Sequence, residues 1–231
     1  MGLTFPLDES NPDPRVACIV LADVSGSMMG EPIEALEKGF TQFVEYIQAP
    51  GLARKRAEVG VITFGSTADV VLPLRGAQEL EPIRFTAGGS TNMAAAIHLG
   101  LDMIEERKAE YKASGIRYYR PWLLVLTDGE PNSAGFDEAV ARLNQVEVAK
   151  GVTVFAVGVG EMANFTMLER LSRDRKPAPL AGLKFEEFFQ WLSDSLSGMS
   201  SSGNHGSSDS EVASNSTEQV PLPPIAGWAT A

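Results

Sequence analysis

Uninterrupted apolar runs alternate along the chain with longer segments in which apolar residues recur every three or four positions. The runs are rich in β-branched and large aliphatic residues, a composition typical of strands buried on both faces of a sheet. We predict strands at residues 16–22, 58–64, 121–127 and 152–159. The periodic segments have the spacing of helices with one apolar face. We predict helices from Pro32, after Asn92, over 136–150, over 165–173 and from Phe185.

One strand is expected to run against the others. Only Gly65-Ser66-Thr67 separates the strand that ends at Phe64 from a further apolar segment, 68–72, and Pro73 is expected to stop that segment. Two strands joined by so short a turn must pair antiparallel. The fold class predicted is therefore α/β: a doubly wound, mostly parallel central sheet with one antiparallel edge strand and helices on both faces.

Composition shifts near both ends divide the chain into four parts. Residues 1–13 are polar and proline-containing and are expected to form an N-terminal arm, whereas 14–198 carry the strand and helix pattern. Residues 199–219 are rich in Ser, Gly and acidic residues, and we expect a flexible linker there. Residues 220–231 combine prolines with Trp228. This peptide is either a docking segment or a tail that folds back on its own domain.

Charge and cysteine content narrow the class of partner and compartment. The net charge of −11 argues against nucleic acid or an anionic membrane as the main partner, because both require a basic surface. Cys18 is the single cysteine, which excludes an intrachain disulfide and favours a reducing compartment. The N-terminus lacks a basic region followed by an apolar segment, and no apolar run approaches the length of a membrane helix. We therefore expect a cytoplasmic protein.

Oxygen-bearing side chains stand where three expected strand ends meet. Asp23, Ser25 and Ser27 follow the first strand at alternate positions, Thr91 opens a helix, and Asp128 follows the strand that ends at residue 127. Loops at the carboxyl ends of parallel strands gather at one edge of such a sheet. Carboxylates and hydroxyls suit a hard divalent cation, and they leave it a position that a partner's carboxylate can fill.

Other interpretations of these residues fit the sequence less well. Alone, Asp-x-Ser-x-Ser is also a helix N-cap pattern. A haloacid-dehalogenase-type phosphatase needs a second Asp where Ser25 stands, and a hydrolase nucleophile elbow needs Gly in place of Asp23. The Gly-rich stretch 158–163 follows a late strand, so we interpret it as a turn rather than a dinucleotide site. His98 has no Cys or His at ligand spacing, and a packed or solvated histidine is expected.

With these residues placed, the chain resembles a von Willebrand factor A (VWA) domain with a metal-ion-dependent adhesion site (MIDAS). The signature of that site is Asp-x-Ser-x-Ser, a Thr in a second loop and an Asp in a third, and the matching residues are Asp23, Ser25, Ser27, Thr91 and Asp128. The resemblance covers residues 14–198. It implies a VWA/Rossmann-like fold, a bound Mg²⁺ (or Mn²⁺ or Ca²⁺), and a protein partner whose Asp or Glu completes the coordination. Ser90 could stand in for Thr91.

A narrower resemblance is carried by two short stretches. Phe-Phe-Gln-Trp-Leu-Ser at 188–193 and the Pro-Pro-x-x-Gly-Trp ending at Trp228 are similar to bacterial tellurium-resistance VWA proteins of the TerY type. That resemblance implies a stress-response system with a serine/threonine phosphatase or kinase as partner.

The function predicted is a non-catalytic, metal-dependent protein-interaction module. Besides the metal ligands, Met28, Ser90, Glu130 and Trp228 are expected to contact the partner. Two alternatives stay open. The same ion could activate water on a phosphate ester, with Glu130 as the one general base in the three loops. Otherwise the metal site is vestigial, and the C-terminal peptide carries the binding.

Overall fold

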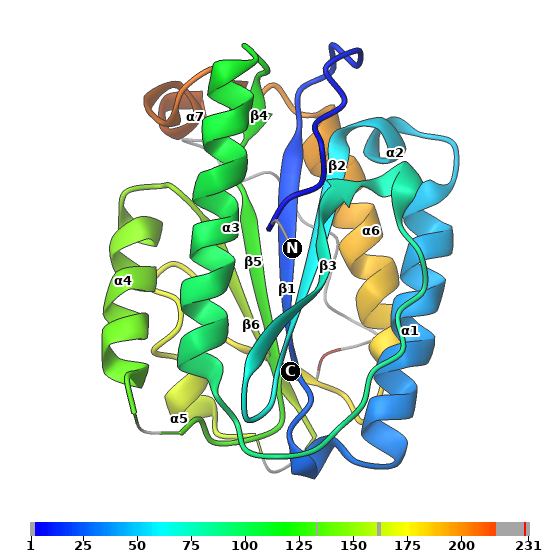
Figure 1. Cartoon of the computed structure of the whole chain (residues 1–231), viewed down its shortest axis with the longest axis vertical. Coiled ribbons are helices and arrows are strands. Elements are labelled where there is room, and N and C mark those ends of the chain that lie inside the picture. The colour runs from blue at the N-terminus through cyan, green and yellow to red at the C-terminus, as the bar shows by residue number, and fades with distance from the viewer. Residues whose placement is uncertain (1–2, 133, 161–162, 216–228, 230–231) are drawn as a thin grey trace.

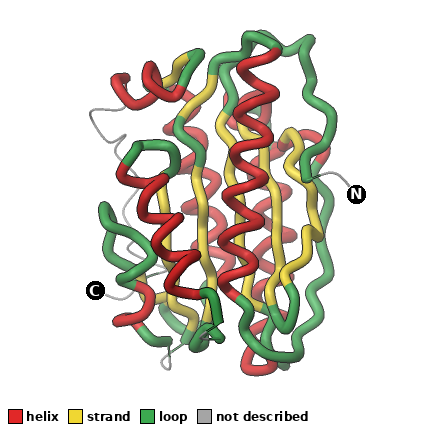
Figure 2. The backbone as a smooth tube through the Cα atoms, turned by 60° about the vertical axis from the view of Figure 1, so that its left-hand side comes forward, coloured by secondary structure: helices red, strands yellow, loops and turns green. Residues whose placement is uncertain are grey.

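The structure is a computed structural model that describes residues 3–132, 134–160, 163–215 and 229. A central sheet lies between two layers of helices (Figures 1 and 2). The first half of the chain contains β1 (Val16–Asp23), η1 (Gly26–Met28), α1 (Glu31–Gln48), α2 (Leu52–Arg56), β2 (Ala57–Phe64), β3 (Ala68–Gly76), η2 (Ala77–Glu79) and α3 (Met93–Ala113). The second half contains β4 (Tyr118–Tyr119), β5 (Trp122–Thr127), α4 (Phe136–Val148), β6 (Thr153–Val159), α5 (Phe165–Leu168), β7 (Ala178–Leu180), α6 (Phe185–Ser201), β8 (His205–Gly206) and α7 (Asp209–Asn215).

The central sheet confirms the predicted fold class. Its strand order is β3-β2-β1-β5-β6-β7, and every neighbouring pair is parallel except β2 with β3. β1 lies in the middle, between β2 and β5, so that Asp23 at its end pairs with Phe64. The carboxyl ends of β1 and β5 therefore open at the same edge of the sheet.

The antiparallel strand is longer than predicted. Pro73 was expected to end it after Leu72, but β3 continues to Gly76. A proline lacks the N–H that a central strand needs, and it is tolerated at a sheet edge, where β3 lies. The register between β2 and β3 shifts near Val61, which accommodates the irregularity.

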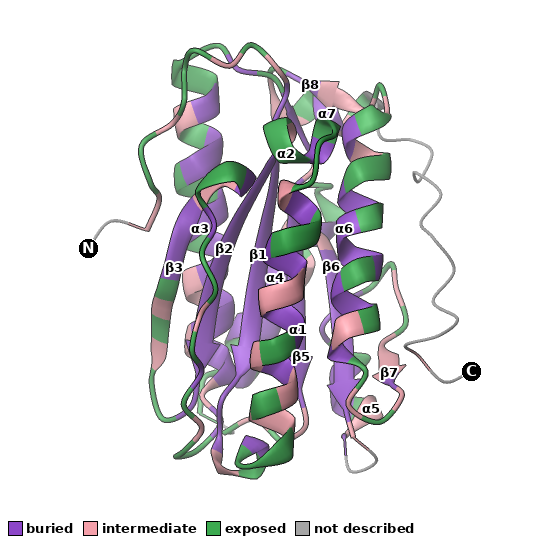
Figure 3. Cartoon of the chain, turned by 90° about the vertical axis from the view of Figure 1, so that its right-hand side faces the viewer, coloured by how far each residue is buried: buried purple, intermediate pink, exposed green. Residues whose placement is uncertain are grey.

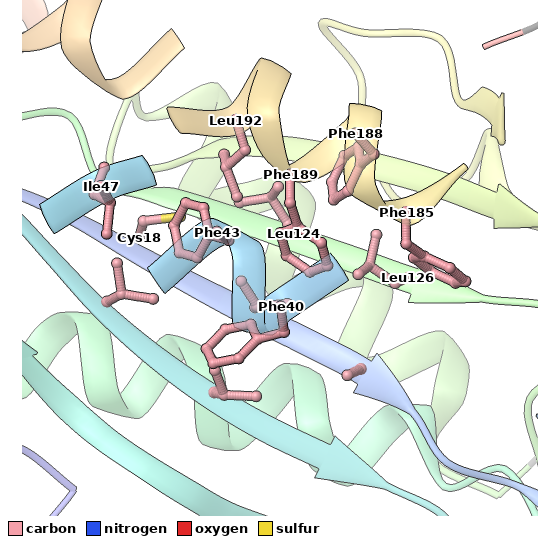
Figure 4. Packing of buried hydrophobic residues seen from close by; sticks show 14 of the residues in the cluster. Cys18, Phe40, Phe43, Ile47, Leu124, Leu126, Phe185, Phe188, Phe189 and Leu192 are labelled. Carbon is pink, nitrogen blue, oxygen red and sulfur yellow. The ribbon is translucent and has the colours of Figure 1, made fainter. Parts of the chain in front are cut away.

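The two faces of the sheet carry separate apolar layers. In Figure 3 the central strands are coloured almost entirely as buried. Side chains of β1 alternate between the layers, as the pleat requires. Figure 4 shows the layer under α1 and α6, where Phe40 and Phe43 of α1 meet Phe189 of α6 at ring-centroid distances of 5.8 and 5.5 Å. Gly39 permits this close approach, since a Cβ there would lie 2.8 Å from Cβ of Phe185.

The expected flexible linker is largely folded, and this expectation was wrong for the part that the structure describes. α6 extends to Ser201, β8 pairs with β4, and α7 packs its buried Val212 near the end of α3. Asp209 anchors α7 through ion pairs with Lys108 and Lys112. Low local hydrophobicity suggested disorder, but the buried Val212 and the shared Asp209 carboxylate both contact the domain beside α7.

Residues near both termini lie against the margins of the sheet. Thr4 forms a parallel bridge with Leu74 of β3, and Ala229 forms an antiparallel bridge with Leu180 of β7. Ala229 also packs, half-buried, against the apolar layer under α1 and α6.

Among the described residues, no helix has the length and apolar character needed to cross a membrane.

Candidate metal centre

Asp23 is the buried anchor of the site. It ends β1, and its side chain is fully inaccessible to solvent. Its Oδ1 accepts a hydrogen bond of 2.8 Å from the Ser25 backbone N–H, and its Oδ2 accepts one of 2.5 Å from the Thr127 hydroxyl. The carboxylate is therefore held in one orientation from both sides.

Hydrogen bonds connect Asp23 to Asp128 through Ser25, whose backbone N–H reaches Asp23, and through Ser27. Ser25 Oγ lies 3.0 Å from Ser27 Oγ, and the Ser27 hydroxyl donates a hydrogen bond of 2.8 Å to Asp128 Oδ1. Ser25 is buried, whereas Ser27 is exposed. The cluster thus runs from the protein interior to the surface, which leaves one side open to a ligand.

Thr91 joins this cluster from the second loop. A Cβ on Gly129 would lie 3.7 Å from Ser27 Oγ and 3.8 Å from Thr91 Oγ1, so both hydroxyls flank the same glycine. The loops are fastened by backbone hydrogen bonds from Gly26 N–H to the Gly89 carbonyl (3.0 Å) and from Asn132 N–H to the Thr91 carbonyl (2.9 Å). Side chains far apart in the sequence therefore meet at one edge of the sheet.

Thr127 was missed by the sequence reasoning. Besides donating to Asp23, its hydroxyl accepts a hydrogen bond of 3.2 Å from the Gly129 N–H. In the sequence Thr127 ends an apolar run, so it was interpreted as the last residue of a strand. In the structure its side chain is buried. The available signal was a lone hydroxyl residue directly before Asp128.

The electrostatics of the cluster favour a cation. Burial raises the pKa of Asp23 above its usual range, the hydrogen bonds from Thr127 and Ser25 lower it, and the charge of Asp128 raises it again. No group of three or more His, Cys, Asp or Glu placed to hold a metal ion occurs in the described part of the chain, so any ion here must also draw on hydroxyl ligands. Two carboxylates and three hydroxyls form an all-oxygen donor set, which fits Mg²⁺, Mn²⁺ or Ca²⁺.

The residues expected to contact a partner lie in different environments. Ser90 is exposed, and its hydroxyl accepts a hydrogen bond of 3.3 Å from the Asn132 amide. Glu130 is exposed and accepts a hydrogen bond from the Asn164 amide.

The prediction that Met28 contacts a partner was wrong. Its side chain is fully buried in the apolar layer under α1. The neighbouring Met29 is the exposed one, with 65% of its surface accessible. Trp228 lies outside the described residues.

Comparisons with known proteins agree with this architecture. A von Willebrand factor type A protein from Catenulispora acidiphila shares 16% identity, over 80% of this chain and 43% of that one, with a TM-score of 0.62. Proximal thread matrix protein 1 from the mussel byssus, solved with a zinc-occupied MIDAS motif, shares 21% identity over 79% and 48%, with a TM-score of 0.55. The ArnB paralog VWA2 from Sulfolobus acidocaldarius shares 18% identity over 79% and 45%, with a TM-score of 0.54.

The chain spans less than half the length of these three solved structures. No curated protein matches the sequence. Residues 18–189 match the von Willebrand factor type A domain, a stretch that begins within β1 and ends within α6. With most of its length matched and the fold shared with solved members, the chain belongs to the von Willebrand factor type A domain family.

Proposed function

We propose that this chain is a metal-dependent protein-interaction module. Asp23, Ser25, Ser27, Thr91 and Asp128 would hold one divalent cation, Mg²⁺, Mn²⁺ or Ca²⁺. The observation that carries the proposal is the hydrogen-bonded connection between Asp23 and Asp128, at the edge of the sheet where β1 and β5 end. It runs from Asp23 through the backbone N–H and hydroxyl of Ser25 and the hydroxyl of Ser27 to Asp128.

The chemistry of the site explains why the partner would present a carboxylate. A divalent cation offsets the two aspartates and leaves the site nearly neutral, and the hydroxyls add no charge. An Asp or Glu side chain from a partner would then make a strong charge-assisted contact at the open side. Ser27 and Ser90 are exposed there, so this side of the site is accessible from solvent.

The proposal is for binding without catalysis. Glu130, the general base considered in the sequence, has one carboxylate oxygen engaged by Asn164. The zinc-occupied MIDAS of the mussel byssus protein supports a cation at the equivalent place, although that protein shares only the fold at 21% identity. We further propose a cytoplasmic role in a tellurium-resistance-type stress response, with a serine/threonine phosphatase or kinase as partner. That part rests on the sequence resemblance alone.

The test couples metal binding to partner capture. Titration calorimetry should show one Mn²⁺ bound per chain in the wild type, with heat lost in Asp23→Ala. The exposed Asp194 on α6 offers a matched control, and Asp194→Ala should bind Mn²⁺ normally.

Partner capture is the second measurement. Proteins captured by the wild type in Mg²⁺ should be released by chelator, and Asp23→Ala should not capture them. Capture that is indifferent to both chelator and Asp23→Ala would refute the module as proposed.

A further inference from the structure

A groove opens beside the candidate metal centre. Its apolar lining includes Phe136 at the start of α4 and Met167 of α5, and its polar lining includes Glu130 and Asn164. Glu130 follows Asp128 by two residues, so this end of the groove lies close to the candidate metal ligands. A peptide bound at the metal is therefore within reach of it.

Glu130 is held in place rather than free to move. The Asn164 amide group donates a hydrogen bond to Glu130 Oε1, while Asn164 Oδ1 accepts one of 3.0 Å from the Met167 N–H at the start of α5. The helix cap thus orients Asn164, and Asn164 orients the carboxylate. A carboxylate fixed in advance loses less entropy when a ligand binds it.

The charge of Glu130 has no cationic partner in the described part of the chain. Arg170, which also lines the groove, forms an ion pair with Asp137 instead. Its guanidinium lies 5.1 Å from the centre of the Phe136 ring. None of the ion pairs between described residues includes Glu130. An exposed, oriented carboxylate next to apolar surface suits a lysine or arginine, whose aliphatic stem can cover that surface.

The same charge would oppose a purely acidic ligand. A partner carboxylate that reaches the metal beside Asp128 also comes near Glu130, which is two residues further along the chain. The two negative charges repel each other. A basic residue near the partner's acidic residue removes this repulsion and adds an attractive contact. Asp128 and Glu130 are two residues apart, and two residues of extended chain span about 7 Å. We therefore expect the partner's basic residue within about three positions of its acidic residue.

We propose that Glu130 and this groove receive a lysine or arginine of the protein partner whose acidic residue reaches the metal. The inference rests on the proposed function, and it adds the sequence class of the partner: an acidic residue with a basic residue close by.

Selection from a displayed library of random peptides in Mg²⁺ tests this directly. The wild-type chain should enrich peptides with an Asp or Glu and a Lys or Arg within three positions, at least fivefold over the unselected library. Glu130→Lys should still enrich the acidic residue but lose the basic one. The control is Glu138→Lys, which makes the same charge change at an exposed position of α4 outside the groove and should select like the wild type.

The outcomes separate this inference from the proposed function. If the acidic residue is enriched only with Mg²⁺, but the basic residue is absent or unaffected by Glu130→Lys, the groove assignment is wrong and the module stands. If the wild type yields no metal-dependent peptides, or Asp23→Ala selects the same ones, both fail. Thermal melts of the Glu130 and Glu138 variants should match the wild type within about 2 °C, because both side chains are exposed.

Discussion

The hydroxyl of Thr127 donates a hydrogen bond of 2.5 Å to Oδ2 of Asp23, across 104 positions of sequence. The contact ties the end of β5 to the end of β1, and it fixes the carboxylate on which the proposed metal site depends. Groups that orient metal ligands in this way strongly affect affinity in other proteins.

Replacing Thr127 should therefore weaken metal binding without removing a ligand. We expect Thr127→Val to lower Mn²⁺ affinity by about 10- to 100-fold in titration calorimetry. It should also cost about 1–3 kcal/mol of stability, because Oδ2 of Asp23 stays buried without a donor. Thr127→Ser keeps the hydroxyl and should bind Mn²⁺ nearly as the wild type does. Equal Mn²⁺ affinity in the Val and Ser variants would exclude the positioning role.

The charge of Asp23 should destabilise the metal-free chain at neutral pH. Its pKa is raised in the folded state, so the folded chain holds this proton more tightly than the unfolded chain does. The protonated Asp23 carboxyl therefore contributes to the free energy of unfolding below its usual pKa of 3.8. This contribution is lost as the pH rises through the raised pKa of the folded state. With chelator at pH 7, Asp23→Asn should melt a few degrees above the wild type, about 2–4 °C per kcal/mol.

Mg²⁺ should reverse that order. It should raise the melting temperature of the wild type more than that of Asp23→Asn, because the substitution removes one of the two carboxylates that would supply charge to the ion. At pH 4 in chelator, the two chains should melt closer together. A variant that is less stable than the wild type at pH 7 in chelator would show that the buried charge is already compensated.

The contact between α1 and α6 gives a prediction about packing. A Cβ at Gly39 would lie 2.8 Å from Cβ of Phe185 and 3.0 Å from the Phe189 ring, so Gly39→Ala must push the helices apart. We expect a loss of about 1–3 kcal/mol in chemical denaturation. Gly198, on the exposed side of α6, has no neighbour within 4 Å of an added Cβ, and Gly198→Ala should stabilise by about 0.5–1 kcal/mol. Similar effects of the two substitutions would contradict the close approach.

Docking of α7 should depend on pH through Asp209. Burial pushes the pKa of this carboxyl upward, but hydrogen bonds from Lys112 and Tyr118 and the charge of Lys108 bring it below its usual value. The stabilisation is therefore present above pH 3.8 and is lost as the pH falls through the lowered pKa. At pH 7, Asp209→Asn should speed amide hydrogen exchange in α7 by about fivefold. Asp194→Asn, on the exposed side of α6, should leave that exchange unchanged.

The sheet, and the meeting of the candidate metal ligands at its edge, could be predicted because each has a local signal. The strands 16–22 and 121–127 are apolar on both faces, and only a strand in the middle of a covered sheet needs that pattern. The rule that loops meet at the carboxyl ends of parallel strands then predicts that Asp23 and Asp128 lie close together.

Features that depend on contacts between residues far apart in the sequence could not be predicted in that way. The buried Met28 looked like a surface residue because it follows a polar loop, yet the turn of η1 directs it inward. The helix α7 depends on Lys108 and Lys112, about a hundred residues earlier in the chain. The bond between Glu130 and Asn164 likewise joins two loops whose proximity only the fold sets.

The bridges of Thr4 to β3 and of Ala229 to β7 have a practical consequence. An uncovered strand edge offers free amide and carbonyl groups to any neighbouring chain, and it is a common starting point for aggregation. Truncated variants that lack either bridging residue, or that carry a bulky fusion beside it, should therefore be checked for oligomers before their binding is measured. Precipitation of a shortened protein would then point to an exposed strand edge rather than to a change at the candidate metal site.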